Sequence, residues 1–246
     1  MDSDPISKAE RIALNFALFN AVDAECDSDF FDLLNAGADP NYFCWHKKEY
    51  VLMHAIAANS IGKVKLLLAF GADPNVRDPK VNYTPLMDAV FRGYDSIAEE
   101  LLKNPKIDIR IKNIQGNTAF SFITYLKSMR VAKLMLEKGA NVNDQDIYGW
   151  TLLMLAIKFN QENMLEVVKF LLANGADPLI RPFAVNSPGI VQGPKNAYEL
   201  AISRHLPEVV DFIGKHLKMR EAFSAIARRD AITSSDLPQK GRQAQW

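Results

Sequence analysis

Apolar residues recur along the chain with the spacing of amphipathic helices. Each run ends in two or three leucine or methionine side chains, and in four of the five runs a glycine follows within a few residues. Glycine at this point tolerates the left-handed backbone that ends many helices. The pattern therefore predicts helices that end near 33–34, 66–68, 101–102, 134–136 and 171–172.

One short phrase follows four of these helices at a near-constant interval. It begins at Gly37, Gly71, Gly139 and Gly175, and it reads Gly-Ala-Asp-Pro in three copies and Gly-Ala-Asn-Val in the other. The intervals are 34, 68 and 36 residues, which gives a period of about 34 with one degenerate copy in the middle. Such a period indicates stacked repeats, whose extended surfaces are suited to binding rather than to catalysis.

A second helix is predicted earlier in each unit. Its clearest opening is Thr84-Pro85-Leu86, where threonine can cap the helix and proline fits the first turn. A small residue follows in several copies, where two helices must approach closely: Ala55, Ala89, Ala156 and Ala201. Each unit is therefore expected to be a helix, a tight turn, a second helix and an extended turn.

Together these features resemble the ankyrin repeat, with its Thr-Pro-Leu-His opening, central alanine and closing Gly-Ala-Asp-x-Asn. The resemblance covers roughly residues 10–216 and implies an all-α solenoid of about six helix-turn-helix units, capped by N- and C-terminal helices. The array is expected to occupy 1–216, followed by a C-terminal helix and a disordered tail over 217–246. Its units are placed at about 7–41, 42–75, 78–110, 113–143, 146–178 and 194–216, with an inserted loop at 181–195.

The chain departs from the family pattern in two ways. No unit keeps the opening histidine, which in the family joins the turns of neighbouring repeats, and its absence predicts a less regular stack. Ile123 stands where the fourth unit would have its alanine, which predicts a locally wider helix pair. The positions of the missing histidines hold Met53, Met87, Ser121, Met154 and Glu199.

The two ends of the array are expected to carry caps. Ser7 and Glu10 have the spacing of a capping box. A polar outer face on this helix is expected from Lys8, Glu10, Arg11 and Asn15. At the other end, apolar side chains are expected to cover the stack: Phe223, Ile226 and Ala227.

Composition narrows the class of partner. Lysine and arginine together number 29, as do aspartate and glutamate, so no overall charge favours nucleic acid. No stretch of apolar residues is long enough to predict a membrane span. Cys26 and Cys44 are expected to be free thiols in a reducing compartment, either the cytoplasm or, for a secreted bacterial effector, the host cytosol. Cys44 and His46 form only a lone pair of metal-ligand types, so neither a metal site nor a cofactor is predicted.

The family resemblance also implies where a partner binds. Ankyrin repeats usually contact partners through the turn tips and the exposed side of the first helix of each unit. Transferring these positions, with the opening threonine of each unit as the anchor, gives a stripe rich in aromatic residues, which are common at interface hot spots. The predicted partner-binding residues are Tyr83, Phe91, Arg92, Tyr125, Ile147, Tyr148, Trp150, Lys158 and Phe159.

The sequence thus predicts a monomeric, non-enzymatic module that binds a protein partner through its turn tips and concave helix face. It does not distinguish an adaptor from an inhibitor or an effector. No catalytic residues are predicted, because no nucleophile–base or phosphate-loop motif is present. The alternative is an enzyme or enzyme subunit in which the 181–195 loop and the C-terminal segment complete an active site.

Overall fold

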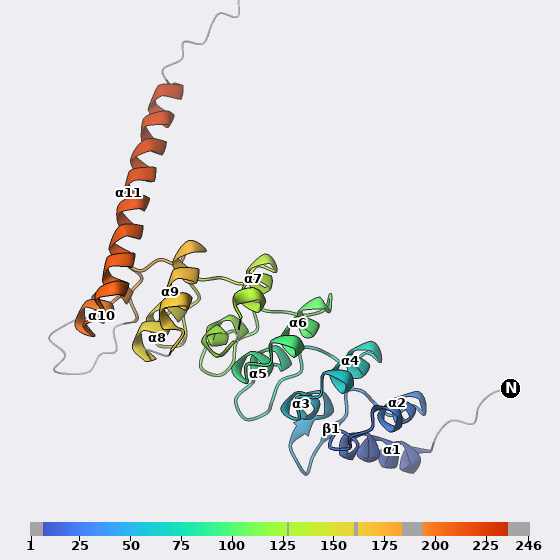
Figure 1. Cartoon of the computed structure of the whole chain (residues 1–246). Helices are drawn as coiled ribbons and strands as arrows, with labels where there is room; N and C mark the ends of the chain where they lie inside the picture. The colour runs from blue at the N-terminus through green and yellow to red at the C-terminus, as the bar shows by residue number, and fades with distance from the viewer. Residues whose placement is uncertain (1–6, 127, 160–161, 184–193, 236–246) are drawn as a thin grey trace, which may run out of the picture.

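The computed structural model shows a curved stack of helix pairs from which one long helix projects (Figure 1). It describes residues 7–126, 128–159, 162–183 and 194–235, with side chains up to residue 225. The pairs are numbered here as units one to six: α1 (Lys8–Asn20) with α2 (Asp27–Asn35), α3 (Val51–Ala57) with α4 (Ile61–Ala69), α5 (Pro85–Phe91) with α6 (Asp95–Lys103), η1 (Ala119–Tyr125) with α7 (Met129–Glu137), α8 (Leu152–Phe159) with α9 (Met164–Ala173), and α10 (Ala197–Ser203) with α11 (Pro207–Ser235).

The third unit shows how the opening residues build a unit. Thr84 lies just before α5, and its Oγ1 accepts a hydrogen bond from the backbone N–H of Met87 at 3.2 Å. Pro85 occupies the first turn, where no intrahelical hydrogen bond is lost. Ala89 is fully buried, as expected for a residue between closely packed helices. These observations confirm the helix-turn-helix reading of the sequence.

The closing phrase forms the predicted turn. Gly71 has φ +91°, the left-handed conformation in which a side chain would be strained. The side chain of Asp73 then accepts a hydrogen bond from the backbone N–H of Asn75 at 2.9 Å. Asp39 and Asp177 make the same bond to the residue two positions further along. Local turn chemistry therefore explains why the phrase repeats.

An asparagine in the phrase joins one unit to the next. Oδ1 of Asn41 accepts a hydrogen bond from the backbone N–H of Asp73 at 2.7 Å, and Asn75 makes the equivalent bond to Asp108 at 2.8 Å. Asn15 begins this ladder by accepting from the N–H of Asp39 at 2.7 Å. Asn15 is therefore buried, and its expected place on a polar outer face is wrong.

The N-terminal cap agrees with the sequence in part. Ser7 and Glu10 form the predicted capping box, with bonds of 3.2 and 2.8 Å in the two directions. Besides its polar residues, however, α1 exposes Ile12 and Phe16 one helical turn apart. The outer face of the first unit is thus less polar than predicted.

The first helix of unit four differs from the others. η1 is a 3₁₀ helix rather than an α-helix. Its sequence, Ala-Phe-Ser-Phe-Ile-Thr-Tyr, consists largely of aromatic and β-branched residues with low helix propensity. The Oγ1 of Thr118 makes no capping bond to it. Ile123 is fully buried in this element.

A short hairpin precedes the first helix of unit two. β1 (Phe43–Cys44) pairs antiparallel with β2 (Glu49–Tyr50), with Phe43 opposite Tyr50. Lys48 adopts φ +55° in the connecting turn. In the part of the chain that the structure describes, β1 and β2 are the one pair of strands, beside an isolated bridge between Gln145 and Thr151, and the periodic pattern did not predict them.

The C-terminal helix packs on the end of the stack through Val209 and Ile213 in its first half, and not through Phe223 as predicted. α11 begins as the second helix of unit six, runs through the expected boundary at residue 216 and projects beyond the stack (Figure 1). Phe223 is 67% exposed, so it is not a capping residue. The side chains of Ile226 and Ala227 lie outside the described part, as do residues 184–193 of the inserted loop and the tail from 236. No helix in the described part is long and apolar enough to cross a bilayer.

Candidate binding groove

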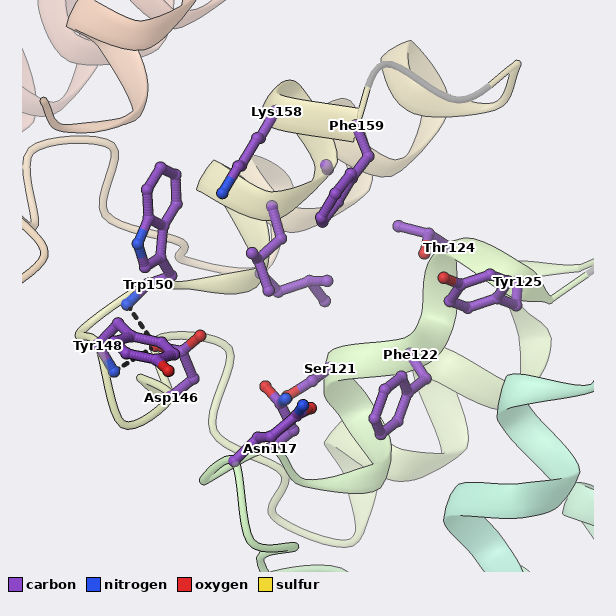
Figure 2. A pocket seen from close by; sticks show the side chains of 14 residues that line it. Asn117, Ser121, Phe122, Thr124, Tyr125, Asp146, Tyr148, Trp150, Lys158 and Phe159 are labelled. Carbon is purple, nitrogen blue, oxygen red and sulfur yellow. Dashed lines mark hydrogen bonds between the residues drawn. The ribbon is translucent and has the colours of Figure 1, made fainter. Parts of the chain in front are cut away.

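A groove of about 310 Å³ lies between units four and five (Figure 2). One side is formed by η1, with Phe122 and Tyr125, and the other by α8, with Lys158 and Phe159. The extended turn before α8 closes one end with Tyr148 and Trp150. Five of the predicted binding residues therefore line a single hollow: Tyr125, Tyr148, Trp150, Lys158 and Phe159.

Asp146 fixes the turn that carries the two aromatic residues. Its Oδ1 accepts hydrogen bonds from the backbone N–H groups of Tyr148 and Trp150, both at 2.9 Å (dashed in Figure 2). Gly149 between them has φ +80°, and a Cβ there would lie 2.4 Å from the backbone nitrogen of Phe183. The turn is thus held in shape by its own carboxylate and by close packing against the next turn.

Neighbouring turns are also joined by backbone hydrogen bonds. The N–H of Ile114 donates to the carbonyl of Val81 at 3.2 Å, and the N–H of Ile147 donates to Gln115 at 3.0 Å. The N–H of Phe183 continues the series by donating to Tyr148 at 2.9 Å. These contacts link the turn tips although every opening histidine is missing.

The groove holds a cation against aromatic faces. Nζ of Lys158 lies 4.3 Å from the centroid of the Trp150 ring and 5.7 Å from that of Phe159. Trp150 is half-buried and packs on the core, whereas Tyr148 is 55% exposed and Phe159 63% exposed. Tyr125, on the other side, is 44% exposed, so the groove combines a fixed indole, one positive charge and three accessible rings.

An aromatic cluster extends the groove toward unit three. Phe91 lies 4.9 Å from Tyr125 and 5.8 Å from Phe122, measured between ring centroids. Tyr83 lies 5.4 Å from Phe122 and 6.1 Å from Phe91. Phe91 thus connects the groove to Tyr83 of unit three, and Phe122 is a groove residue that was not among the predicted ones. Leu126, the residue after Tyr125, is buried.

A second hollow, of about 320 Å³, lies between units two and three. Tyr83 and Arg92 line it, while Ile147 is exposed on its turn and lines neither hollow. Arg92 is held by Asp88, with Nε 2.9 Å from Oδ1. Burial raises the pKa of Asp88, and the neighbouring Arg92 opposes that shift.

The hairpin of unit two presents a residue that sequence reasoning passed over. Trp45 is 80% exposed, more than any other large apolar side chain in the described part of the chain. The sequence drew attention to it only as the middle of Cys44-Trp45-His46. Cys44 is buried and His46 exposed, and no group of three metal-ligand residues lies together in the described part.

The stacked units and the groove across their turns define a helical-repeat binding scaffold, and comparison with known proteins gives its family. A family model described as "Ankyrin repeats (3 copies)" matches residues 18–113 and 105–181. The chain therefore belongs to the ankyrin-repeat family, whose members are generally non-enzymatic modules of protein–protein interaction.

Individual relatives share the repeats at modest identity. The chain is 28% identical to the fowlpox virus ankyrin repeat protein FPV230 over 179 residues, which cover 70% of this chain and 88% of that protein. It is 31% identical to fowlpox virus FPV024 over 108 residues, 44% of this chain but only 18% of that protein. The crystal structure of EF0377, an ankyrin repeat protein, superposes with a TM-score of 0.67 at 23% identity, covering 81% of this chain and 97% of that one.

Proposed function

We propose that this protein is a non-enzymatic interaction module that holds a protein partner in the groove between units four and five. The observation that carries the proposal is the set of exposed rings, Tyr125, Tyr148 and Phe159, that line one groove beside a turn already fixed by Asp146. Aromatic residues are enriched among interface hot spots because they bury a large area and lose little conformational freedom. The groove residues we assign to the partner are Tyr125, Tyr148, Trp150, Lys158 and Phe159.

A prearranged surface of this kind favours binding. The turn hydrogen bonds and the contact between Lys158 and Trp150 hold the side chains before a partner arrives. Little ordering free energy then has to be supplied on association. Phe91 and Tyr83 extend the contact surface toward unit three, where Arg92 lies at its edge. Ile147 is exposed on the turn of unit five, next to Tyr148 in the chain.

The role as adaptor, inhibitor or effector depends on the partner. Cys26 is exposed and free, and Cys44 is buried and free, which supports a reducing compartment such as the cytoplasm. Most of the 181–195 loop, on which the enzymatic alternative depended, lies outside the described residues. Of its described ends, Arg181 is engaged in an ion pair with Glu199 and donates to the carbonyl of Pro194.

The test is an affinity capture from cell lysate followed by a binding titration with each purified candidate. The double variant Tyr148→Ala/Phe159→Ala removes two exposed rings, and each hot-spot ring is expected to contribute about 2 kcal/mol. Met219→Ala/Phe223→Ala is the matched control, because it also removes exposed apolar side chains but from α11. A partner lost by the first variant and kept by the control supports the proposal. If both variants keep every partner at unchanged thermal stability, the groove is not the binding site.

A further inference from the structure

The second hollow differs from the aromatic groove in its charges. It is lined by four cationic side chains, Lys47, Lys48, Lys80 and Arg92, and by three acidic ones. Each acidic side chain forms a hydrogen bond or an ion pair within the protein. Because Arg92 is paired with Asp88, the hollow offers its three lysines to a ligand.

The three carboxylates have internal partners. An oxygen of Glu49 lies 3.3 Å from Nδ1 of His54. The carboxylate of Asp78 accepts from the backbone N–H groups of Lys80 at 3.0 Å and Val81 at 2.8 Å. Asp88 is paired with Arg92, as described above.

The three lysines, in contrast, are exposed, and none of them forms an ion pair within the described part of the chain. Lys47 and Lys48 lie on the hairpin turn of unit two, and Lys80 lies on the turn of unit three. They therefore converge on one hollow from two units. Attraction between these lysines and negative charges on a partner would select and orient that partner more than it would strengthen binding.

The hollow and the groove belong to one continuous surface. Tyr83 lines the hollow and lies 5.4 Å from Phe122, which lines the groove. The two sites are separated by about two units, or roughly 16–20 Å at the usual spacing of packed helices. An extended chain covers that distance in about five or six residues.

We infer that the partner binds through an extended segment in which a cluster of carboxylates lies about five or six residues from an aromatic or large apolar anchor. The carboxylates contact Lys47, Lys48 and Lys80, and the anchor enters the groove beside Trp150 and Phe159. This inference rests on the proposed function. A protein segment fits better than a nucleic acid, because the groove end of the surface is largely aromatic and, among its described lining residues, offers Lys158 alone as a cation, so it has little to neutralise a continuous polyanion.

The test uses a phage library of random 16-residue peptides selected on the full-length protein. Wild type is compared with Lys47→Glu/Lys48→Glu/Lys80→Glu. The matched control is Lys65→Glu/Lys133→Glu/Lys138→Glu, which makes the same change of charge at exposed lysines on α4 and at α7. A third selection uses Tyr148→Ala/Phe159→Ala.

Wild type and the control variant are expected to select peptides with acidic residues at the stated spacing from an aromatic one. The variant Lys47→Glu/Lys48→Glu/Lys80→Glu is expected to select peptides that keep the aromatic anchor but lack the acidic residues. For one synthetic selected peptide, each Glu→Gln or Asp→Asn change should weaken binding about two- to fivefold, and less at high salt.

The two proposals fail in different ways. The first outcome is a set of peptides that carry an aromatic anchor without an excess of acidic residues and whose binding depends on Tyr148 and Phe159. It would overturn the inference of an acidic segment and leave the proposed binding groove standing. A random single-stranded oligonucleotide that displaces the peptide at equal concentration would overturn the choice of a protein segment. Selection of no peptide, or of peptides that ignore the groove variant, would overturn the proposed function itself.

Discussion

Asn143 joins units four and five: its Oδ1 accepts a hydrogen bond from the backbone N–H of Asp177 at 2.8 Å. Its Nδ2 donates to the carbonyl of Gly175 at 3.1 Å. The side chain therefore satisfies a donor and an acceptor of the following turn at once. Because Asn41 and Asn75 do the same earlier in the chain, the position acts as a repeated link between units.

The ladder lacks this link between units three and four, where Arg110 stands in place of asparagine. We predict that Arg110→Asn raises the free energy of unfolding by about 0.5–1.5 kcal/mol, the usual net value of one hydrogen bond, by accepting from the N–H of Asn141. Urea denaturation measures the change. Arg110→Ala is the control, since it removes the same guanidinium without adding an acceptor. Equal stability of the two variants would contradict the prediction.

Lys63 is a buried lysine whose role is structural. It is 3% exposed, and its Nζ donates to the carbonyl of Val22 at 2.8 Å and to that of Ala24. Lys63→Met keeps the length of the side chain but leaves these carbonyls without a donor, so we expect a loss of about 1–3 kcal/mol of stability. The exposed Lys65→Met should change stability by less than about 0.5 kcal/mol. Similar melting temperatures for the two variants would show that Lys63 does not hold the first turn.

His54 should make stability depend on pH. Its ring stacks on Phe19 at 4.4 Å and contacts both Glu49 and Asp23. The hydrogen bond to Glu49 is the largest cause of a raised pKa, burial opposes it, and the charge of Asp23 adds to it. Because the pKa of His54 is raised in the folded state, the charged ring contributes fully to stability below the unfolded pKa of about 6.5. This contribution is lost as the pH rises through the folded pKa.

We therefore predict that His54→Gln destabilises the protein more at pH 5.5 than at pH 8.5. Urea denaturation of both proteins at the two pH values measures this difference. His46→Gln, at an exposed histidine on the adjacent hairpin, serves as the control. A loss of stability from His54→Gln that is the same at both pH values would mean that packing on Phe19, and not the charge, is what the histidine provides.

The parts of the molecule that repeat were predictable from the sequence, and those that do not repeat were not. Gly71 and Asp73 belong to a turn that recurs about every 34 residues. The fold, and the places of Tyr148 and Trp150 on their turn, could therefore be predicted by aligning the units with one another. Trp45 lies on the hairpin of β1 and β2, the one pair of strands within the described residues. Phe122 lines the groove from a helix position whose equivalents, Asp88 in α5 and Leu155 in α8, also line a hollow, but the family positions transferred to the sequence did not include it.

The last prediction separates positioning from stability at the groove. The carboxylate of Asp146 is bound within its own turn, because its Oδ1 accepts hydrogen bonds from the backbone N–H groups of Tyr148 and Trp150. Asp146→Asn keeps that acceptor, whereas Asp146→Ala removes it and frees the turn. We expect Asp146→Ala to weaken binding of a selected groove peptide about tenfold, which corresponds to the loss of about 1.5 kcal/mol from the turn hydrogen bonds. We expect Asp146→Asn to bind the same peptide within about twofold of wild type. Isothermal titration measures both variants, and hydrogen exchange over residues 146–151 should rise only in the alanine variant. Equal weakening by both substitutions would show that the negative charge itself, rather than the fixed turn, is what the partner recognises.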